Sequence, residues 1–215
     1  MKIFAVATQK GGAGKTTTAG HVGVELSRRG NRVVLVDMDP QGNLAAWWNS
    51  REAEEPRLLQ VTLDRLDHSL EILAQDGFDY AVIDTPPRAF VDGNDSPADP
   101  IIRAAIRVAD LVIVPSKASP HDLRAVAPTL ELVADNNKPV VFLINDATAN
   151  TRLKSDAMQT LSQFGKLSPV LHHRNIFVES MIDGRTAMEV RPGHIGSIEV
   201  RKLVDYLLEQ TAATE

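Results

Sequence analysis

The sequence predicts an α/β fold with three layers, in which a mostly parallel, twisted sheet is covered by helices on both faces. Three observations lead to this prediction. Short apolar runs rich in Val, Ile, Leu and Phe recur along the chain, as in strands that are buried on both faces. Each run is bounded by Gly, Pro, Asp or Asn. Helical stretches separate the runs, and this alternation is typical of parallel sheets.

Five apolar runs predict the strands, over Ile3–Thr8, Val33–Asp37, Tyr80–Asp84, Leu111–Pro115 and Val140–Asn145. The expected helices cover Thr16–Arg29, Leu63–Ala74, Pro100–Ala109, Leu123–Asp135, Leu153–Phe164 and Ile198–Gln210. Gly30 favours the end of the first helix, because glycine readily adopts the left-handed conformation of a helix C-terminus. We expect one domain over residues 1–215. The longest irregular stretch, Thr85–Asp99, directly follows a strand, and loops of this length are more often functional than idle.

Composition excludes several classes of protein. The chain has 215 residues and a formal net charge of −5, so any contact with DNA must come from a local basic patch. It contains no cysteine, which excludes disulfides, thiolate zinc sites, cysteine nucleophiles and iron–sulfur clusters and fits a cytoplasmic protein. No run approaches the roughly 18 apolar residues that span a bilayer. The N-terminus lacks the cleavage pattern of a signal peptide.

The strongest motif is a glycine-rich loop, Lys10–Thr17, which follows the first predicted strand and opens the first predicted helix. Glycines let backbone N–H groups converge on phosphate oxygens, and the helix N-terminus adds partial positive charge. Lys15 supplies a mobile charge for the outer phosphates, and the Thr16 hydroxyl is placed to ligate Mg²⁺. The residues expected to contact the nucleotide here are Gly11, Gly12, Ala13, Gly14, Lys15, Thr16 and Thr17.

The loop departs from the standard phosphate-loop pattern, because Gln9 stands in place of glycine and a second lysine, Lys10, comes next. This form is the deviant Walker A motif, and with it the chain resembles the ParA/MinD family of P-loop ATPases, in particular the short ParA-type partition ATPases. VDMDPQGN at 36–43 resembles the family's first switch, and DYAVIDTPP at 79–87 resembles its Walker B strand and second switch. Shorter matches at 114–116, 143–145 and 180–184 follow in the family's order. The resemblance implies a P-loop NTPase fold, ATP hydrolysis and Mg²⁺ as cofactor.

The resemblance also implies roles for individual residues. Lys15 and Lys10 are implied as catalytic cations, with Lys10 reaching across a dimer interface to the partner's nucleotide. Asp39 is implied as the switch carboxylate that positions or activates the attacking water. Asn145, at the end of the fifth strand, is implied at the adenine base. The residues implied around the metal are Thr16, Asp37 and Asp84.

Apart from Lys15 and Thr16, each of these assignments has a structural alternative. Asp84 could be an ordinary strand-end aspartate that caps the next turn, and Asn145 could be a turn residue. Lys10 could be a solvated lysine beside a polyanion site. Adjacent strand-end carboxylates are common turn formers, and the sequence does not divide the roles of Asp37 and Asp39.

The implied function is ATP-dependent DNA segregation. A homodimer that forms with ATP would bind DNA without sequence preference and be released after a centromere-binding adaptor protein stimulates an otherwise weak hydrolysis, which implies a cytoplasmic, nucleoid-associated protein. Non-specific binding needs only Lys and Arg on phosphates. Residues 147–202 carry 8 basic and 5 acidic side chains, whereas residues 50–100 carry 4 basic and 12 acidic ones. The candidates for DNA contact in the more basic third are Arg185, Arg191 and Arg201.

Alternative functions remain. The same type of ATPase could position a protein cluster or an organelle instead of DNA. A MinD-like membrane-associated regulator would end in a basic amphipathic helix, whereas EVRKLVDYLLEQ at 199–210 predicts a helix packed on the core and no membrane partner. A protein like nitrogenase iron protein would need cysteines that bind a cluster. Because the chain starts directly at the first strand, we expect no helix-turn-helix domain for operator binding.

Two pairs of ring-bearing residues are left without an assigned function. His172 and His173 have no evident third metal ligand, which favours a surface or structural role. Trp47 and Trp48 follow the first switch, where core packing and contact with a partner are both open.

Overall fold

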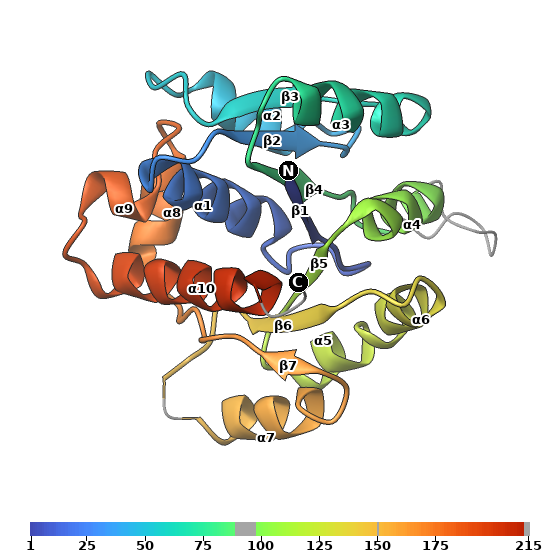
Figure 1. The fold of residues 1–215 in the computed structure, drawn as a ribbon. Coiled ribbons are helices and arrows are strands. Elements are labelled where there is room, and N and C mark those ends of the chain that lie inside the picture. The colour runs from blue at the N-terminus through green and yellow to red at the C-terminus, as the bar shows by residue number, and fades with distance from the viewer. Residues whose placement is uncertain (89–97, 150, 213–215) are drawn as a thin grey trace.

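The computed structural model describes residues 1–88, 98–149 and 151–212, and a seven-stranded sheet forms its centre (Figure 1). The strand order is β3-β2-β4-β1-β5-β6-β7, and every neighbouring pair is parallel. The strands are β1 (Lys2–Val6), β2 (Val33–Asp37), β3 (Arg57–Gln60), β4 (Tyr80–Asp84), β5 (Leu111–Ser116), β6 (Val140–Ile144) and β7 (Lys166–Leu167). The predicted α/β fold with a parallel sheet is confirmed.

The five predicted strands are all present, with small differences at their ends. β1 stops at Val6, two residues before the predicted end at Thr8, because the chain already turns into the glycine-rich loop. β5 extends one residue further, to Ser116, and β6 ends one residue earlier, at Ile144. The edge strands β3 and β7 were not predicted, because they are only 4 and 2 residues long and are not fully buried.

The helices are α1 (Lys15–Arg28), α2 (Asn43–Asn49), the 3-10 helix η1 (Leu63–Arg65), α3 (Leu66–Gln75), α4 (Ala98–Val108), α5 (Pro120–Arg124), α6 (Ala127–Asp135), α7 (Arg152–Leu161), α8 (Asn175–Met181), α9 (Ala187–Val190) and α10 (Ile195–Ala212). The single helix predicted over Leu123–Asp135 is wrong, since α5 and α6 divide that stretch. Ser119 caps α5, and Pro128 lies in the first turn of α6, where a helix needs no N–H donor.

Three short helices were not predicted. α2, α8 and α9 have 7, 7 and 4 residues, which is too short for a clear helical period. The irregular stretch expected over Thr85–Asp99 is described only in part. Residues 89–97 lie outside the described residues, and Ala98 and Asp99 already belong to α4.

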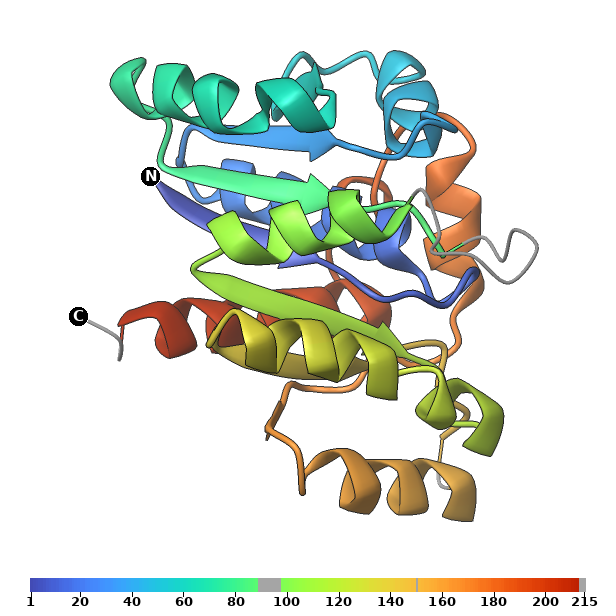
Figure 2. The ribbon, with the colours of Figure 1, turned by 90° about the vertical axis from the view of Figure 1, so that its right-hand side faces the viewer.

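Each face of the sheet is covered by its own set of helices (Figure 2). One buried cluster joins α3, α4, α6 and α7 to the sheet, and the other joins α1, α2, α8, α9 and α10. On α10 the apolar face predicted to pack on the core is buried, with Val200, Leu203, Val204 and Leu207 at 1% exposure or less. Within the described part of the chain, we find no helix of the length and apolarity needed to cross a bilayer.

Parallel pairing brings several chemically active residues to one edge of the sheet. Asp37, the last residue of β2, is in register with Asp84, the last residue of β4. Asp84 is also in register with Val6, which ends β1 shortly before the glycine-rich loop. In parallel sheets the carboxyl ends of the strands form the usual ligand-binding edge. The fold thus brings the loop and the two carboxylates together.

A buried histidine joins α1 to α9. His21 is 1% exposed; its Nδ1 lies 2.9 Å from the Thr17 carbonyl oxygen, and its Nε2 accepts a hydrogen bond of 3.2 Å from the Ala187 N–H. Because the Ala187 N–H can only donate, the ring proton lies on Nδ1 and is donated to Thr17. Phe177 packs at nearly a right angle to the ring. Burial lowers the pKa of His21 to about 4, so the ring is neutral at pH 7.

We expect His21 to make folding stability depend on pH. In the unfolded chain a histidine has a pKa of about 6.5, and in the folded protein burial lowers it to about 4. The stability that the neutral ring contributes is therefore present above pH 6.5 and is lost as the pH falls towards 4. Denaturant unfolding should show a loss of about 2 kcal/mol from this residue between pH 7 and pH 4.5.

The variant His21→Gln keeps a donor for Thr17 and an acceptor for Ala187 but does not titrate. Its stability should fall less than that of the wild type over the same pH range. The matched control is His68→Gln, at an exposed position on α3, which should keep the wild-type pH dependence. Equal pH dependence in His21→Gln and the wild type would contradict this interpretation.

Candidate functional site

The loop between β1 and α1 has the shape of a cradle for an anion. Gly12 and Gly14 have φ angles of +72° and +92°, in the left-handed region that favours glycine. A Cβ atom on Gly14 would lie 1.9 Å from Nδ2 of Asn145, so the neighbouring side chain also requires glycine there. α1 begins at Lys15, which places the partial positive charge of a helix N-terminus at the loop.

Lys15 is buried under this loop. Its side chain donates a hydrogen bond of 3.2 Å to the Lys10 carbonyl oxygen, and the residue is 7% exposed. Burial lowers the pKa of Lys15, although the nearby carboxylates Asp84 and Asp39 act in the opposite direction. A lysine that has lost most of its hydration and faces the cradle is well prepared to bind phosphate oxygens.

Asp84 lies beside the start of α1 and is completely buried. The Thr16 hydroxyl donates a hydrogen bond of 2.7 Å to Asp84 Oδ2, while Oδ1 has no hydrogen-bond partner within the described residues. Burial raises the pKa of Asp84 to about 7; Asp37 and Asp39 add to the increase, and Thr16 and Lys15 oppose it. The ionised carboxylate is therefore short of positive charge and of one partner.

These residues fit a magnesium ion. A buried carboxylate oxygen without a partner, next to a hydroxyl, is an oxygen donor set that a hard divalent cation would satisfy. Within residues 1–88, 98–149 and 151–212, no group of three or more acidic or histidine side chains could hold a metal by itself. Mg²⁺ suits a site with few protein ligands, because it usually keeps several waters and takes other ligands from substrate phosphates.

Asp37 and Asp39 shape the turn that follows β2. Asp37 Oδ1 accepts a hydrogen bond of 3.0 Å from the Asp39 N–H, and Oδ2 accepts one of 2.9 Å from the Ala45 N–H in the first turn of α2. Asp39 Oδ1 accepts one of 2.9 Å from the Gln41 N–H. Burial raises the pKa of Asp37, against the effect of these backbone bonds. Both oxygens of Asp37 thus hold the turn, and its place at the metal stays a prediction.

A cavity of about 410 Å³ opens beside the loop, a size within the usual range for small ligands. Asn145 lies in its wall, as the sequence predicts for a residue at the carboxyl edge. Its Nδ2 donates to the Ala13 carbonyl oxygen at 3.1 Å, and its Oδ1 accepts from the Asp146 N–H at 2.9 Å. Asn145 therefore braces the loop against β6, and its contact with the adenine base stays a prediction.

Lys117 and Asp146, which the sequence analysis did not single out, also line this cavity. Lys117 Nζ and His173 Nδ1 lie 2.7 and 2.5 Å from the two carboxylate oxygens of Asp146. No motif links these residues, because they come from separate elements. Lys117 directly follows β5, however, and Asp146 comes two residues after β6, so the rule that ligands bind at the carboxyl ends of strands could have found them. His172 pairs with Glu199 at 2.9 Å, which is a structural contact.

Lys10 is more exposed than Lys15 and lines a cavity of its own. Its side chain is 32% exposed, and its Nζ lies 3.9 Å from Asp122 Oδ1. It lines a cavity of about 660 Å³ together with Arg88 and Arg124. The two lysines of the motif thus have different surroundings: Lys15 is buried near Asp84 and Asp39, and Lys10 is partly exposed near Asp122.

The three arginines predicted to contact DNA differ in their surroundings. Arg185 pairs with Asp183 at 2.5 Å, and Arg201 donates to the Pro192 carbonyl oxygen at 2.7 Å. Arg191 is exposed, and its side chain makes no hydrogen bond or ion pair with the part of the chain that the structure describes. All three lie between the end of α8 and the first turns of α10. Of the three, Arg191 is the most available to a phosphate.

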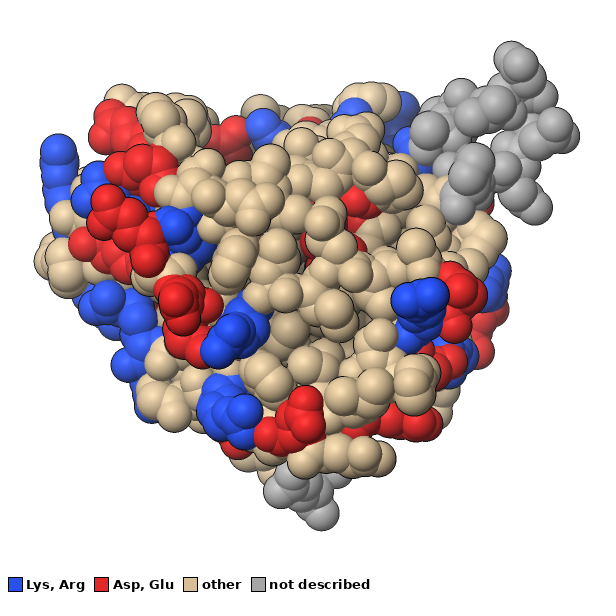
Figure 3. Space-filling model, turned by 90° about the horizontal axis from the view of Figure 1, so that it is seen from above, with Lys and Arg blue, Asp and Glu red and all other residues tan. Residues whose placement is uncertain are grey.

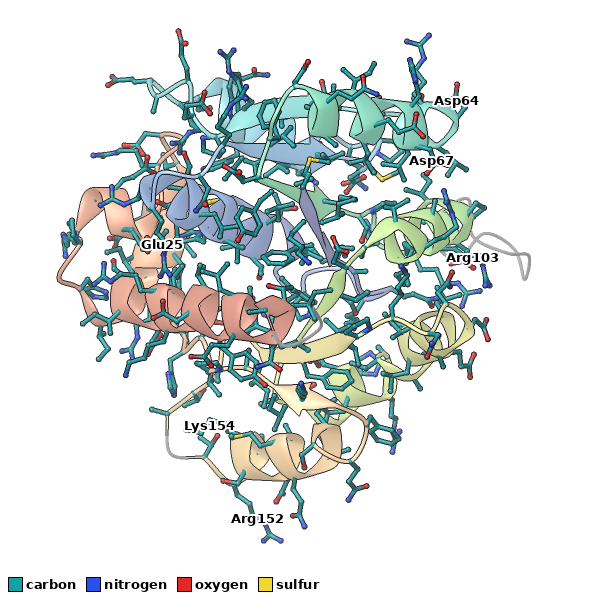
Figure 4. All side chains as sticks on the ribbon, in the orientation of Figure 1. Glu25, Asp64, Asp67, Arg103, Arg152 and Lys154 are labelled. Carbon is teal, nitrogen blue, oxygen red and sulfur yellow. The ribbon has the colours of Figure 1, made fainter. Side chains whose placement is uncertain are left out.

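The basic residues of the C-terminal third do not form one surface. Arg152 and Lys154 lie on α7, below the β7 edge of the sheet and away from α9, and Arg152 points outwards with 94% of its side chain exposed (Figure 4). On the face seen in Figure 3, positive and negative side chains lie next to one another. A DNA contact therefore requires a small patch, as the net charge already indicated.

Comparison with known proteins identifies relatives of the chain. A family model described as the CobQ/CobB/MinD/ParA nucleotide binding domain matches residues 4–186. Maintenance of carboxysome distribution protein A of Halothiobacillus neapolitanus is 30% identical over 95% of both chains. Protein ParA of Rhizobium radiobacter is 30% identical over 87% of this chain and 80% of its own. Chromosome-partitioning ATPase Soj of Thermus thermophilus is 29% identical over 97% and 96%.

Solved structures share the fold at lower identity. The septum site-determining protein MinD of Pyrococcus horikoshii, complexed with Mg-ADP, has a TM-score of 0.76 at 16% identity, covering 96% of this chain and 95% of that one. A complex of a McdA variant from Cyanothece with ATP has a TM-score of 0.72 at 20% identity, covering 97% and 95%. The predicted P-loop fold and ATPase activity are thus confirmed, and the chain belongs to the CobQ/CobB/MinD/ParA nucleotide-binding family as an ATPase of the ParA/MinD type.

Proposed function

We propose that this ATPase forms a homodimer with Mg-ATP, binds DNA without sequence preference in that state, and leaves the DNA after a partner protein stimulates hydrolysis. The observation that carries the proposal is the meeting of the loop, the Thr16–Asp84 pair and the turn after β2 at one edge of the sheet, while Lys10 is partly exposed. The same proposal places the protein in the cytoplasm in association with the nucleoid, and gives it a centromere-binding adaptor as the partner that stimulates hydrolysis.

Within one chain, positioning and charge would do most of the chemical work, as phosphoryl transfer requires. Lys15 and the N–H groups of the loop would bind the β- and γ-phosphates. Thr16 and Asp84 would hold Mg²⁺, which neutralises phosphate oxygens when it is bound. Asp39 would orient the attacking water, and Asp37 would keep Asp39 in place through the turn that it holds.

Lys10 would complete the site of a second copy. A cation that crosses to the partner's nucleotide stabilises the charge of the transition state, as an arginine finger does, and makes dimer formation depend on the γ-phosphate. Two observations support this assignment: Lys10 does not line the cavity that contains Asn145, and its ion pair with Asp122 is long, at 3.9 Å. Such a pair is weak enough to exchange for a phosphate.

A second candidate for the cargo is a protein compartment. It is favoured by the relative named for carboxysome distribution, which matches 95% of this chain, whereas the relatives named ParA and Soj favour DNA partition. Both versions use the same cycle of dimer, DNA and release. They differ only in which adaptor stimulates the ATPase.

The first test is binding to duplex DNA of random sequence with Mg-ATP, with Mg-ADP and without nucleotide. We expect binding with Mg-ATP alone, weakened by added salt, because the contacts would be to phosphates. Lys10→Ala should abolish it, because the variant would not form the dimer. Fluorescence anisotropy of labelled DNA measures the affinity.

The matched control for this experiment is Lys138→Ala. Lys138 precedes β6 and so lies at the opposite edge of the sheet, and this variant should bind DNA like the wild type. If the wild type dimerises with ATP but binds DNA in no nucleotide state, the partition proposal is wrong. Pelleting with anionic vesicles would then test whether the protein binds a membrane instead. The present proposal expects no binding to the vesicles.

Asp84→Asn should separate stability from activity. With burial raising the pKa of Asp84 to about 7, the ionised side chain disfavours the folded state at pH 8, and the neutral amide removes that cost. We therefore expect a higher melting temperature without nucleotide, and Mg²⁺ affinity in the presence of ATP that is about 10- to 100-fold weaker. The control, Asp76→Asn at an exposed position after α3, should change neither. An unchanged Mg²⁺ affinity would remove Asp84 from the proposed metal site.

Arg191→Ala should weaken DNA binding without changing ATP hydrolysis. Losing one phosphate contact should reduce affinity at all sequences alike and lower the slope of log affinity against log salt by about 1. Arg103→Ala is the matched control, because Arg103 is an exposed arginine on α4 that pairs with Asp135 (Figure 4). Equal effects of the two substitutions would mean that Arg191 contributes only to net charge.

A further inference from the structure

Residues 183–190 form a strap that contacts α1 on one side and the segment at 47–51 on the other. On one side, the Ala187 N–H donates to His21, and His21 in turn donates to the Thr17 carbonyl oxygen in the first turn of α1. That turn directly continues the glycine-rich loop. On the other side, the strap is held by the segment that includes α2 and Arg51.

Arg51 makes most of the contacts on that second side. Its side chain is 2% exposed, and Nη1 donates to the Gly184 carbonyl oxygen at 2.6 Å. Two further hydrogen bonds, of 2.8 and 3.2 Å, join both terminal nitrogens to the Glu189 carboxylate. Glu189 also accepts from the Thr186 N–H at 2.7 Å and so caps α9. One guanidinium thus grips both ends of the strap.

The backbone of the strap approaches α2 so closely that only glycine fits. Gly184 has a φ angle of +76°, and a Cβ there would lie 2.5 Å from the Arg51 backbone nitrogen. Trp47 adds a second attachment, since its indole N–H donates to the Arg185 carbonyl oxygen at 3.3 Å. The Arg51 guanidinium lies 5.1 Å from the centre of the Trp47 ring. Because closely packed groups leave no free space between them, a shift of α2 would also displace the strap.

α2 is tied just as closely to the turn after β2. Asp37 accepts a hydrogen bond from the Ala45 N–H inside α2, the Asp39 carbonyl oxygen accepts one of 2.8 Å from the Gly42 N–H, and the Gly42 carbonyl oxygen accepts one of 2.8 Å from the Ala46 N–H. The turn and the helix therefore move as one unit. Segments that contact a γ-phosphate commonly change position when it is lost.

We propose that Arg51 is a positioning residue that transmits the nucleotide-dependent position of the turn at 37–42 to the strap at 183–190, so that the exposed surface around Arg185 differs between the ATP and ADP states. The proposal rests on the proposed function in one respect, which is that this turn responds to the γ-phosphate. It adds a mechanical link between the phosphate site and the surface expected to contact DNA.

The chain carries its own reporter for this link. Trp47 and Trp48 are its two tryptophans, and the Trp48 indole N–H is bound elsewhere, to the Pro56 carbonyl oxygen at 2.7 Å. In a Trp48→Phe background, all indole fluorescence therefore comes from Trp47, which contacts both Arg51 and the strap. We expect its emission maximum or quenching by acrylamide to differ between Mg-ADP and a slowly hydrolysed Mg-ATP analogue.

Arg51→Lys in the same background keeps the positive charge but has one terminal nitrogen in place of the two that bind the Gly184 carbonyl oxygen and both Glu189 carboxylate oxygens. It should abolish the difference in Trp47 emission between the two nucleotides while nucleotide affinity stays within about twofold of the background, since Arg51 does not contact the phosphate cradle. The matched control is Arg57→Lys, in which the arginine pairs with Glu55 nearby but is 60% exposed. This control should keep the full nucleotide response. A purely structural role for Arg51 would lower the melting temperature and leave the response intact.

DNA binding provides the second measurement. In the Arg51→Lys variant, the ratio of DNA affinity with the Mg-ATP analogue to DNA affinity with Mg-ADP should fall about tenfold or more. A coupling between two binding sites typically has this size, and the variant would lose it. Identical Trp47 emission with the two nucleotides in the Trp48→Phe protein would overturn the inference, even if DNA binding stays ATP-dependent. If no state binds DNA but Trp47 still responds through Arg51, the proposed function fails and the link stands.

Discussion

The burial of Asp84 is the constraint on which the rest of the site depends. A carboxylate without water is tolerated only beside donors or positive charge, and here both come from the first turn of α1, as the Thr16 hydroxyl and the Lys15 ammonium. They reach Asp84 because β1 and β4 are neighbours, with Val6 in register opposite Asp84. The strand order, the loop and the start of the helix thus serve one electrostatic requirement, which a bound cation would complete.

The sequence predicted the centre of the fold better than its edges. β2 and β4 begin and end where expected, because strands buried on both faces are apolar at almost every position and therefore stand out. β3 lies at an edge and exposes Arg57 and Gln60, so its pattern does not differ from that of a loop. The short helix α9 begins with a capping box, Thr186-x-x-Glu189, which is a local signal that was overlooked, whereas its contact between Glu189 and Arg51 is distant and no local pattern contains it.

The candidate site also has one part that the sequence predicts and another that it does not. The places of Lys15 and Thr16 could be predicted because the glycine-rich motif fixes their spacing at the start of α1, and that of Asp84 because it ends a clear strand. The contact of Asn145 could not, because the Ala13 carbonyl oxygen that its side chain binds is 132 residues away along the chain. The contacts of Asp37 are local, but they depend on the exact path of the turn before α2, a short helix that the sequence did not predict. The strap was missed because three of its attachments, at His21, Trp47 and Arg51, lie more than 130 residues away along the chain.

The two faces of the sheet contribute unequally to the loop, the turn and the strap, and this affects which parts of the sequence can change. The helices that brace the turn and the strap lie on the face of α1, α2, α8, α9 and α10. On the other face, α6 holds the start of the glycine-rich loop through the hydrogen bond of 3.2 Å from the Gln9 N–H to Thr129 Oγ1, while α3, α4 and α7 contribute mainly packing. Substitutions on α3, α4 and α7 can therefore change the exposed surface of the protein while the residues of the nucleotide site stay the same. The same site can in this way be combined with many different surfaces.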